Sequence, residues 1–271
     1  MGTVLLCQDS LEGVFTGIYK AYERKENHKE CKVKAGQPDN YELFASYVEI
    51  QPEEELARKV SRTICRDLGM EAYMAICHAL ATEEEDKADA VYHTVVEGLK
   101  QYGKGNQKHF TEKSPFRQAT GGIMGNLTNP YVRKVFELSR STEFEIMRIK
   151  QFLRFQELEN GILYARIGPK CNILSFIAPH FVNRLPLENF VIHDDKRQLF
   201  VVHPAKQEWF VVTGAHFNEE ITKRFSTKEQ QYEELFTHFC HTIAIKERKN
   251  LNLQRQMLPI RFREYMVEFS G

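Results

Sequence analysis

The sequence predicts an α+β fold that is rich in helices and carries a small antiparallel sheet. Helical and strand-like segments do not alternate regularly along the chain, which argues against a repeated βαβ architecture. Three strand-like runs at residues 190–193, 199–203 and 209–213 are separated by short polar intervals, a pattern typical of an antiparallel meander. We therefore expect two parts: an N-terminal α/β segment at residues 1–80 and a C-terminal α+β domain at residues 82–271.

The N-terminal part is expected to begin with a buried strand at Thr3–Cys7, followed by a helix that Asp9 or Ser10 caps. A polar stretch at residues 23–40 is interpreted as a loop. A second strand, closed by Pro52, is expected to follow it. Helical periodicity then recurs in three stretches. The expected second strand spans residues 41–50, and the helical stretches span residues 56–68, 73–80 and 88–99.

The C-terminal part opens with a glycine-rich loop at residues 103–125, which has five glycines but no phosphate-binding motif of recognised spacing. Asn129 and Pro130 have the pattern of a helix start, and we expect a long helix to run from there to Asn160-Gly161. A strand, a further helix and the three-strand meander follow, and Thr227 is expected to cap the next helix. A basic segment and a last short helix near residues 262–269 complete the chain.

Composition excludes some classes of protein. Lys plus Arg and Asp plus Glu both number 37 in 271 residues, so the chain is neither a globally basic coat protein nor an acidic disordered one. No apolar run approaches the roughly 20 residues of a membrane helix, and the N-terminus lacks the features of a signal peptide, so we expect a cytoplasmic protein with no membrane contact. The six cysteines show no spacing typical of zinc or an iron–sulfur cluster, so we expect no metal or other cofactor.

The strongest local feature is a basic segment near the C-terminus. Residues 246–263 contain six Lys or Arg and a single acid, in a chain with no net charge. This asymmetry indicates a contact with a polyanion, for which DNA is the candidate. The opposing interpretation is a solvated face with ion pairs to the acidic residues at 53–55 or 83–86. The candidate nucleic-acid-binding residues are Lys246, Arg248, Lys249, Asn250, Gln254, Arg255, Arg261 and Arg263.

A candidate catalytic set consists of His180, Asp194 and Arg154. Histidine, aspartate and arginine gathered in one cleft are able to perform acid–base chemistry or bind phosphate. The structural alternative is a turn built on Asp194 and a hydrogen-bonded core histidine. No hydrolase or metalloprotease motif supports the catalytic interpretation.

Several short motifs, taken in order, carry a resemblance that spans nearly the whole chain. They lie at Asp9–Gly13, Arg154–Leu158, Gly161–Ala165, Ala178–Phe181 with Arg184, Ile243–Asn250 and Leu253–Gln256. On these residues the chain resembles the bacterial DNA-metabolism proteins that contain domain of unknown function 4130.

The resemblance implies an accessory protein of DNA repair or modification that binds nucleic acid and works with a separate radical-SAM enzyme. Relatives are fused to a uracil-DNA-glycosylase-like domain, which points the same way by association. Two alternatives remain open: a nucleic-acid-processing enzyme with its own active site around His180 and Asp194, and a protein–protein adaptor. Where relatives have Asn-Glu-Ala-His, this chain has Phe144-Glu145-Ile146-Met147, so we expect Glu145 to matter less than the C-terminal arginines.

Overall fold

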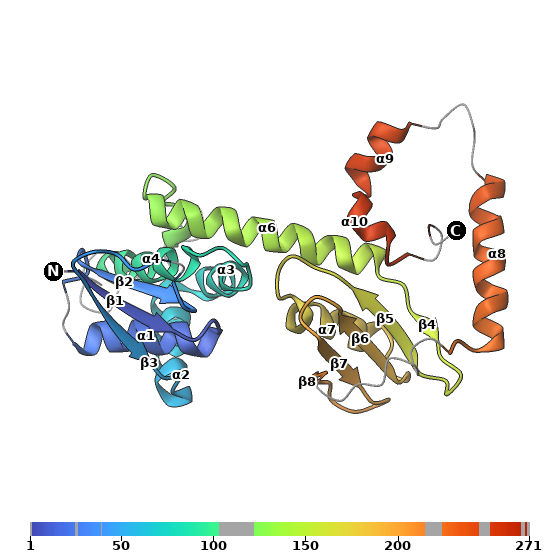
Figure 1. Cartoon of the computed structure of the whole chain (residues 1–271), viewed down its shortest axis with the longest axis horizontal. Helices are drawn as coiled ribbons and strands as arrows, with labels where there is room; N and C mark the ends of the chain where they lie inside the picture. The colour runs from blue at the N-terminus through green and yellow to red at the C-terminus, as the bar shows by residue number, and fades with distance from the viewer. Residues whose placement is uncertain are drawn as a thin grey trace. The chain divides into compact units, whose positions relative to one another are not determined.

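A computed structural model describes residues 2–24, 27–38, 40–102, 122–214, 224–243, 250–266 and 269. The chain forms two compact units, Met1–Glu143 and Phe144–Gly271. Both units combine helices with a small sheet, which confirms the α+β class (Figure 1). The boundary expected at residues 80–82 lies inside the first unit, and most of the glycine-rich loop at 103–125 lies outside the described residues.

The first unit has a three-stranded sheet in the order β2-β1-β3, and both pairings are parallel (Figure 1). Its strands are β1 (Gly2–Cys7), β2 (Cys31–Ala35) and β3 (Ala45–Ile50). Strand β2 lies within the stretch that was predicted to be a loop, so that prediction was wrong. Cys31 and Val33 are buried and alternate with Lys32 and Lys34, a period-two pattern too short to stand out in a polar sequence.

Helices surround this sheet and form the core of the first unit with it. They are α1 (Leu11–Glu23), α2 (Glu54–Thr63) with the π-helical turn η1 (Ile64–Leu68), α3 (Met70–Leu80), α4 (Lys87–Tyr102) and the 3₁₀ turn η3 (Gly122–Gly125). The Ser10 side chain caps α1 by accepting a hydrogen bond from the Gly13 backbone N–H at 3.0 Å. Gly17 lets α1 pack closely on β1, because a Cβ at this position would overlap the Cys7 Sγ.

The long helix α6 (Pro130–Phe152) starts where the sequence predicted. The Asn129 side chain caps it by accepting a hydrogen bond from the Tyr131 backbone N–H at 2.9 Å. The helix ends at Phe152, before the predicted stop at Asn160-Gly161, because residues 156–157 pair as a strand instead. The last part of α6, from Phe144 onward, belongs to the second unit and supplies side chains to its candidate site.

The second unit has a five-stranded sheet in the order β4-β5-β6-β7-β8. Its strands are β4 (Gln156–Glu157), β5 (Leu163–Ile167), β6 (Phe190–Asp194), β7 (Leu199–His203) and β8 (Phe210–Thr213). The predicted meander is confirmed, because β6, β7 and β8 pair antiparallel in sequence order. The sheet as a whole is mixed, which corrects the prediction of a purely antiparallel one: α7 (Leu174–Arg184) crosses between β5 and β6 and makes them parallel.

Three helices follow the sheet: α8 (Thr227–Ile243), α9 (Leu251–Met257) and α10 (Ile260–Arg263). The start of α8 is tied to β4, since the Glu229 carboxylate accepts a hydrogen bond from the Glu157 backbone N–H at 3.0 Å. Helix α10 is anchored by Phe262, which is buried with its ring centroid 5.9 Å from that of Phe152. None of the helices in the described ranges is long and apolar enough to cross a membrane.

Candidate functional site

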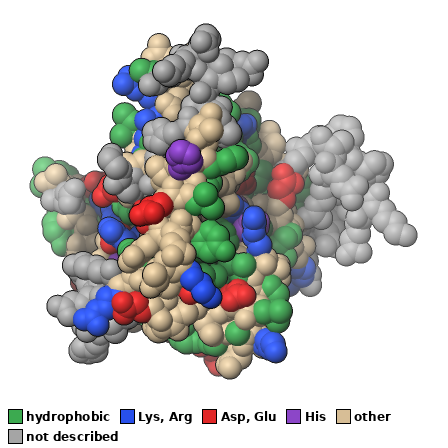
Figure 2. Space-filling view, turned by 90° about the vertical axis from the view of Figure 1, so that its right-hand side faces the viewer, with side chains coloured by type: hydrophobic (Ala, Val, Ile, Leu, Met, Phe, Trp, Pro, Cys, Tyr) green, Lys and Arg blue, Asp and Glu red, His purple; other side chains and the backbone are tan. Residues whose placement is uncertain are grey.

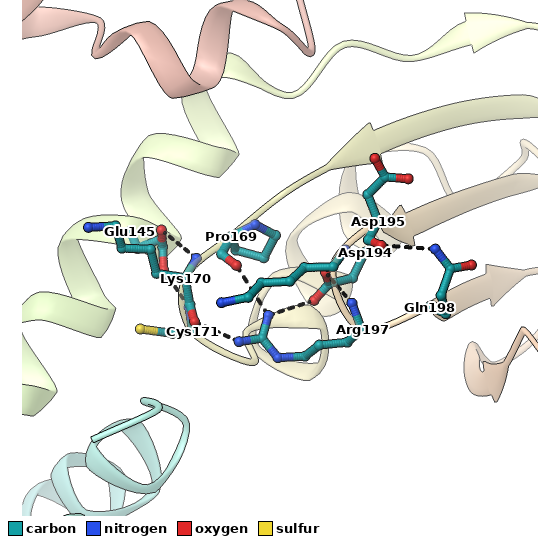
Figure 3. Close-up of polar contacts among 9 residues, drawn as sticks. Glu145, Pro169, Lys170, Cys171, Asp194, Asp195, Arg197 and Gln198 are labelled. Carbon is teal, nitrogen blue, oxygen red and sulfur yellow. Dashed lines mark hydrogen bonds and ion pairs between the residues drawn. The ribbon is translucent and has the colours of Figure 1, made fainter. Parts of the chain in front are cut away.

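Two buried carboxylates hold one loop of the second unit from opposite sides. The loop is Gly168–Cys171, which connects β5 to α7, and Figure 3 shows Pro169–Cys171 between Glu145 on one side and Asp194 with Arg197 on the other. Glu145, on α6, is 3% exposed and accepts hydrogen bonds from the backbone N–H groups of Lys170 at 3.0 Å and Cys171 at 2.8 Å. The loop therefore supplies the donors that a buried carboxylate requires.

Asp194 supports the same loop through Arg197. Its carboxylate is fully buried at the end of β6, where one oxygen accepts hydrogen bonds from the backbone N–H groups of Lys196 and Arg197, as in a turn stabilised by aspartate. The other oxygen lies 3.0 Å from Nη1 of Arg197. The Arg197 guanidinium also donates to the carbonyls of Pro169 and Lys170, at 3.2 and 2.6 Å (Figure 3). Asp194 thus has the structural role that the sequence left open.

Glu145 also binds the C-terminal helix. Its Oε1 lies 2.8 Å from Nη2 of Arg261, whose guanidinium stacks over the ring of Phe262 with 4.7 Å between the guanidinium carbon and the ring centroid. The expectation that Glu145 matters less than the C-terminal arginines was based on its neighbour Met147, which replaces a histidine of the relatives. Met147 is 48% exposed, and residues two apart on a helix point to different faces. Glu145 therefore has its own partners, and its role does not depend on position 147.

Two cationic side chains lie close enough to His180 on α7 to affect its charge. The pKa of His180 is lowered, first by loss of hydration and then by the positive charges of Lys150 on α6 and Arg184 on α7. In the part of the chain that the structure describes, neither Lys150 nor Arg184 forms an ion pair. We call Lys150, His180 and Arg184 the cation patch. Two cations without a counter-charge beside a neutral imidazole favour binding of an anion.

The three residues of the predicted catalytic set occupy different environments. Asp194 is buried and bonded to its own turn and to Arg197. His180 belongs to the cation patch, and Arg154, just beyond the end of α6, donates hydrogen bonds to the carbonyls of Gln151 and Leu153. The sequence named His180 and noted Arg184, but it missed Lys150. No spacing in the sequence connects position 150 to position 180, because only the packing of α6 beside α7 does so.

The predicted nucleic-acid-binding residues divide into three groups. Lys246, Arg248 and Lys249 lie outside the described residues. Asn250 caps α9 by accepting a hydrogen bond from the Leu253 backbone N–H at 3.0 Å, and Arg261 pairs with Glu145. Gln254 and Arg255 are exposed, and Arg263 is partly buried.

Four of the acidic residues proposed as alternative partners of the basic segment pair with other residues. Glu53, Glu54, Glu84 and Glu85 form ion pairs within the first unit. Their partners there are Lys20, Arg58, Lys134 and Lys34, respectively.

The described side chains offer no metal site, and at least two of their thiols are unreactive. Across the described ranges, no group of three or more His, Cys, Asp or Glu is placed to hold a metal ion. Cys7, Cys31, Cys65, Cys77 and Cys171 form no disulfide bond in the described part of the chain. Burial raises the pKa of Cys7 to about 12 and that of Cys77 to about 11, which keeps both protonated and unreactive near neutral pH.

Comparison with known protein families gives one match. The sequence pattern described as "Domain of unknown function (DUF4130)" matches residues 85–268, a span that begins close to the expected start of the C-terminal domain at residue 82. No curated protein matches the chain. One similar solved structure is described as a member of the s1p family of ribosomal proteins, DHH domain. It is 10% identical, covers 75% of this chain and 74% of its own, and has a TM-score of 0.32, too low to support any argument.

Proposed function

The chain belongs to the family defined by domain of unknown function 4130, and on that premise we propose that it is a cytoplasmic accessory protein of DNA repair or modification. In this proposal it binds the phosphate backbone of nucleic acid through the second unit. A separate radical-SAM enzyme, the partner that the family resemblance implies, performs the chemistry.

The observation that carries the proposal is the cation patch. Loss of hydration lowers the pKa of His180 first, Lys150 and Arg184 lower it further, and no carboxylate is among the groups that perturb it. Cations gathered without a counter-charge repel one another, and the phosphate groups of nucleic acid relieve that repulsion and release counterions. Because such contacts touch only phosphate, they support binding to many sequences, as an accessory protein requires.

Helices α9 and α10 provide a second predicted contact. Arg255 is exposed on α9, and Arg263 follows Arg261 on α10. The Glu145–Arg261 ion pair and the buried Phe262 fix α10 on the second unit. A basic helix that is fixed in place loses less conformational entropy on binding than a free tail, which supports its use as a contact surface.

The test is the salt dependence of DNA binding by the full chain. The variant Lys150→Gln/Arg184→Gln removes two charges from the cation patch. Each phosphate contact contributes about 0.9 to the slope of log affinity against log salt on duplex DNA, so this variant should flatten the slope by about two. Affinity measured by fluorescence anisotropy at four or more salt concentrations, on one labelled duplex and one labelled single strand, gives the slopes.

The matched control is Lys32→Gln, which removes an exposed charge from the first unit, where Lys32 pairs with Glu42 at 2.7 Å. Its salt slope should equal that of the parent protein. Failure of the parent to bind either DNA at low salt would refute direct recognition. Equal slopes for the parent and the double variant would show that the protein binds DNA but that the cation patch does not contact it.

A protein–protein adaptor is the second candidate, and α8 is the observation that favours it. Tyr232, Leu235, Phe236 and Phe239 recur at helical spacing and are all exposed, with Tyr232 at 67%. Figure 2 is viewed from the side on which Figure 1 draws α8, and hydrophobic side chains there lie among scattered charges of both signs. Exposed apolar stripes of this kind are typical of protein interfaces. Leu235→Glu should abolish co-purification with the radical-SAM partner and leave the DNA salt slope unchanged.

A further inference from the structure

The two edges of the five-stranded sheet in the second unit differ in whether other residues hydrogen-bond to them. The outer edge of β4 is covered by the chain at residues 224–226: the Glu159 backbone N–H donates to the Arg224 carbonyl at 3.0 Å, and the Ser226 N–H donates to the Glu157 carbonyl at 2.9 Å. The Glu157 N–H donates to the Glu229 carboxylate. The opposite edge is β8, and among the described residues nothing accepts from or donates to its outer side.

The hydrogen-bond pattern shows which backbone groups of β8 face outward. The Gly214 N–H donates to the Gln198 carbonyl, so Gly214 and Gln198 form a hydrogen-bonded pair of the antiparallel ladder between β8 and β7. Such pairs alternate with non-hydrogen-bonded pairs, so Val212 and Phe210 also bond to β7. The N–H and C=O groups of Val211 and Thr213 therefore point away from β7, and among the described residues no strand pairs with them.

The side chains of β8 carry no feature that would prevent a second strand from pairing with its outer edge. Phe210, Val211 and Val212 are 48%, 43% and 39% exposed, and Thr213 is exposed as well. Natural edge strands are commonly protected by a charge, a proline or a bulge, and β8 has neither charge nor proline within it. An uncharged apolar edge with unpaired backbone groups is complementary to another extended, uncharged strand.

We propose that this chain forms a homodimer in which β8 pairs antiparallel with β8 of a second copy. The outward groups of Val211 and Thr213 define the register: Val211 of each copy bonds to Thr213 of the other, and Val212 lies on the two-fold axis. The pairing is self-complementary, as an isologous interface requires, because each copy offers the same donors and acceptors in reverse order. Strand pairing joins the two sheets into one continuous ten-stranded sheet, so that the β8 edge of each copy is paired.

The test uses the residue on the axis. In this register the two copies of Val212 form a non-hydrogen-bonded pair with Cα atoms about 4.5 Å apart, where like charges are unfavourable and opposite charges favourable. By light scattering after size exclusion, the full chain should shift with rising concentration from 31.7 kDa toward twice that mass. Val212→Lys and Val212→Asp should each stay monomeric, and an equimolar mixture of the two should recover the dimer.

The control is Leu187→Lys, which places the same charge on a side chain of the second unit that is 64% exposed and should leave the dimer unchanged. Amide hydrogen exchange of the parent tests the register without a substitution. The amides of Val211 and Thr213 should slow as concentration rises, whereas those of Phe210 and Val212 should be slow throughout. A parent that stays monomeric, a dimer that survives Val212→Lys, or slow exchange of Val211 and Thr213 in dilute monomer would overturn the proposal.

Discussion

The Glu145 carboxylate lies 2.8 Å from the Arg261 guanidinium, and this ion pair joins the middle of the sequence to its end. Glu145 is almost fully buried, whereas the Arg261 side chain is one-third exposed. The carboxylate also bonds to two backbone N–H groups of the Gly168–Cys171 loop. One residue of α6 therefore contacts both the loop and α10.

Glu145→Gln should lower the free energy of unfolding by about 2–3 kcal/mol, because an amide cannot accept both loop hydrogen bonds and also neutralise Arg261. Urea denaturation followed by circular dichroism measures the change. Glu137→Gln, an exposed position on the same helix, is the control and should stay within about 0.5 kcal/mol of the parent. Equal stability of the two variants would show that the buried carboxylate does not hold the loop.

Asp194 and Arg197 should behave as one structural unit. Asp194→Asn and Arg197→Met should each cost about 2–4 kcal/mol, because each leaves a buried polar partner without its counterpart. The double variant should cost less than the sum of the two by 1 kcal/mol or more, on the order expected for residues in one network. A double-mutant cycle by urea denaturation checks this, and strict additivity would separate Asp194 from Arg197.

The stability of the protein should depend on the protonation of His180. Its pKa is lowered in the folded state, first by loss of hydration and then by Lys150 and Arg184, so the unfolded chain binds the proton more tightly. The contribution is fully present above the unfolded pKa of about 6.5 and is lost as the pH falls through and below that value. Unfolding curves between pH 8 and pH 5 should show a steeper loss for the parent than for His180→Gln.

A phosphate bound at the cation patch should have the opposite effect on His180, because a neighbouring negative charge stabilises the imidazolium. DNA binding should then take up a proton, and affinity should rise as the pH falls from 8 to 6. His180→Gln should reduce that rise while keeping most of the salt dependence contributed by Lys150 and Arg184. Anisotropy titrations at fixed ionic strength measure both, and identical pH profiles for parent and variant would exclude His180 from the contact.

Any side chain at position 168 should destabilise the protein as long as the Tyr265 ring stays in its present position. A Cβ at position 168 would overlap the Tyr265 ring, whose centroid lies 5.8 Å from the Arg166 guanidinium carbon. Gly168→Ala should cost about 1–3 kcal/mol of stability through this overpacking. In the background of Tyr265→Ala the same substitution should cost much less. An equal cost in both backgrounds would place the strain in the backbone of the loop.

Local signals predicted several elements well because short-range physics sets them. Asn129 and Pro130 mark the start of α6, since capping and a fixed proline φ act within one turn. The meander of β6, β7 and β8 follows from apolar runs separated by short polar turns. Strand β2 was not predicted in this way, because its two buried residues form a strand only through backbone hydrogen bonds with β1.

The candidate site was predicted only in part. The sequence named His180, Asp194 and Arg261 by residue type, and it left Asp194 open between a catalytic role and a turn. Burial and the Arg197 contacts support the turn. It did not predict the structural contacts of Glu145 with the Gly168–Cys171 loop and Arg261, because these partners lie far from Glu145 in the sequence.

The sequence by itself determined the α+β class, the starts of α1 and α6, the antiparallel meander and the family, because capping, periodicity and motif order depend on residues close together in the chain. Tertiary structure alone decided that α7 makes the second sheet mixed, that Lys150 joins His180 and Arg184, and that Glu145 meets Arg261. These relationships join residues far apart in the chain, and each depends on which faces of α6, α7 and α10 are buried together. Which faces pack together depends on the total apolar surface that the fold removes from water. That total involves residues from the whole chain, so it is not evident from any short stretch of sequence.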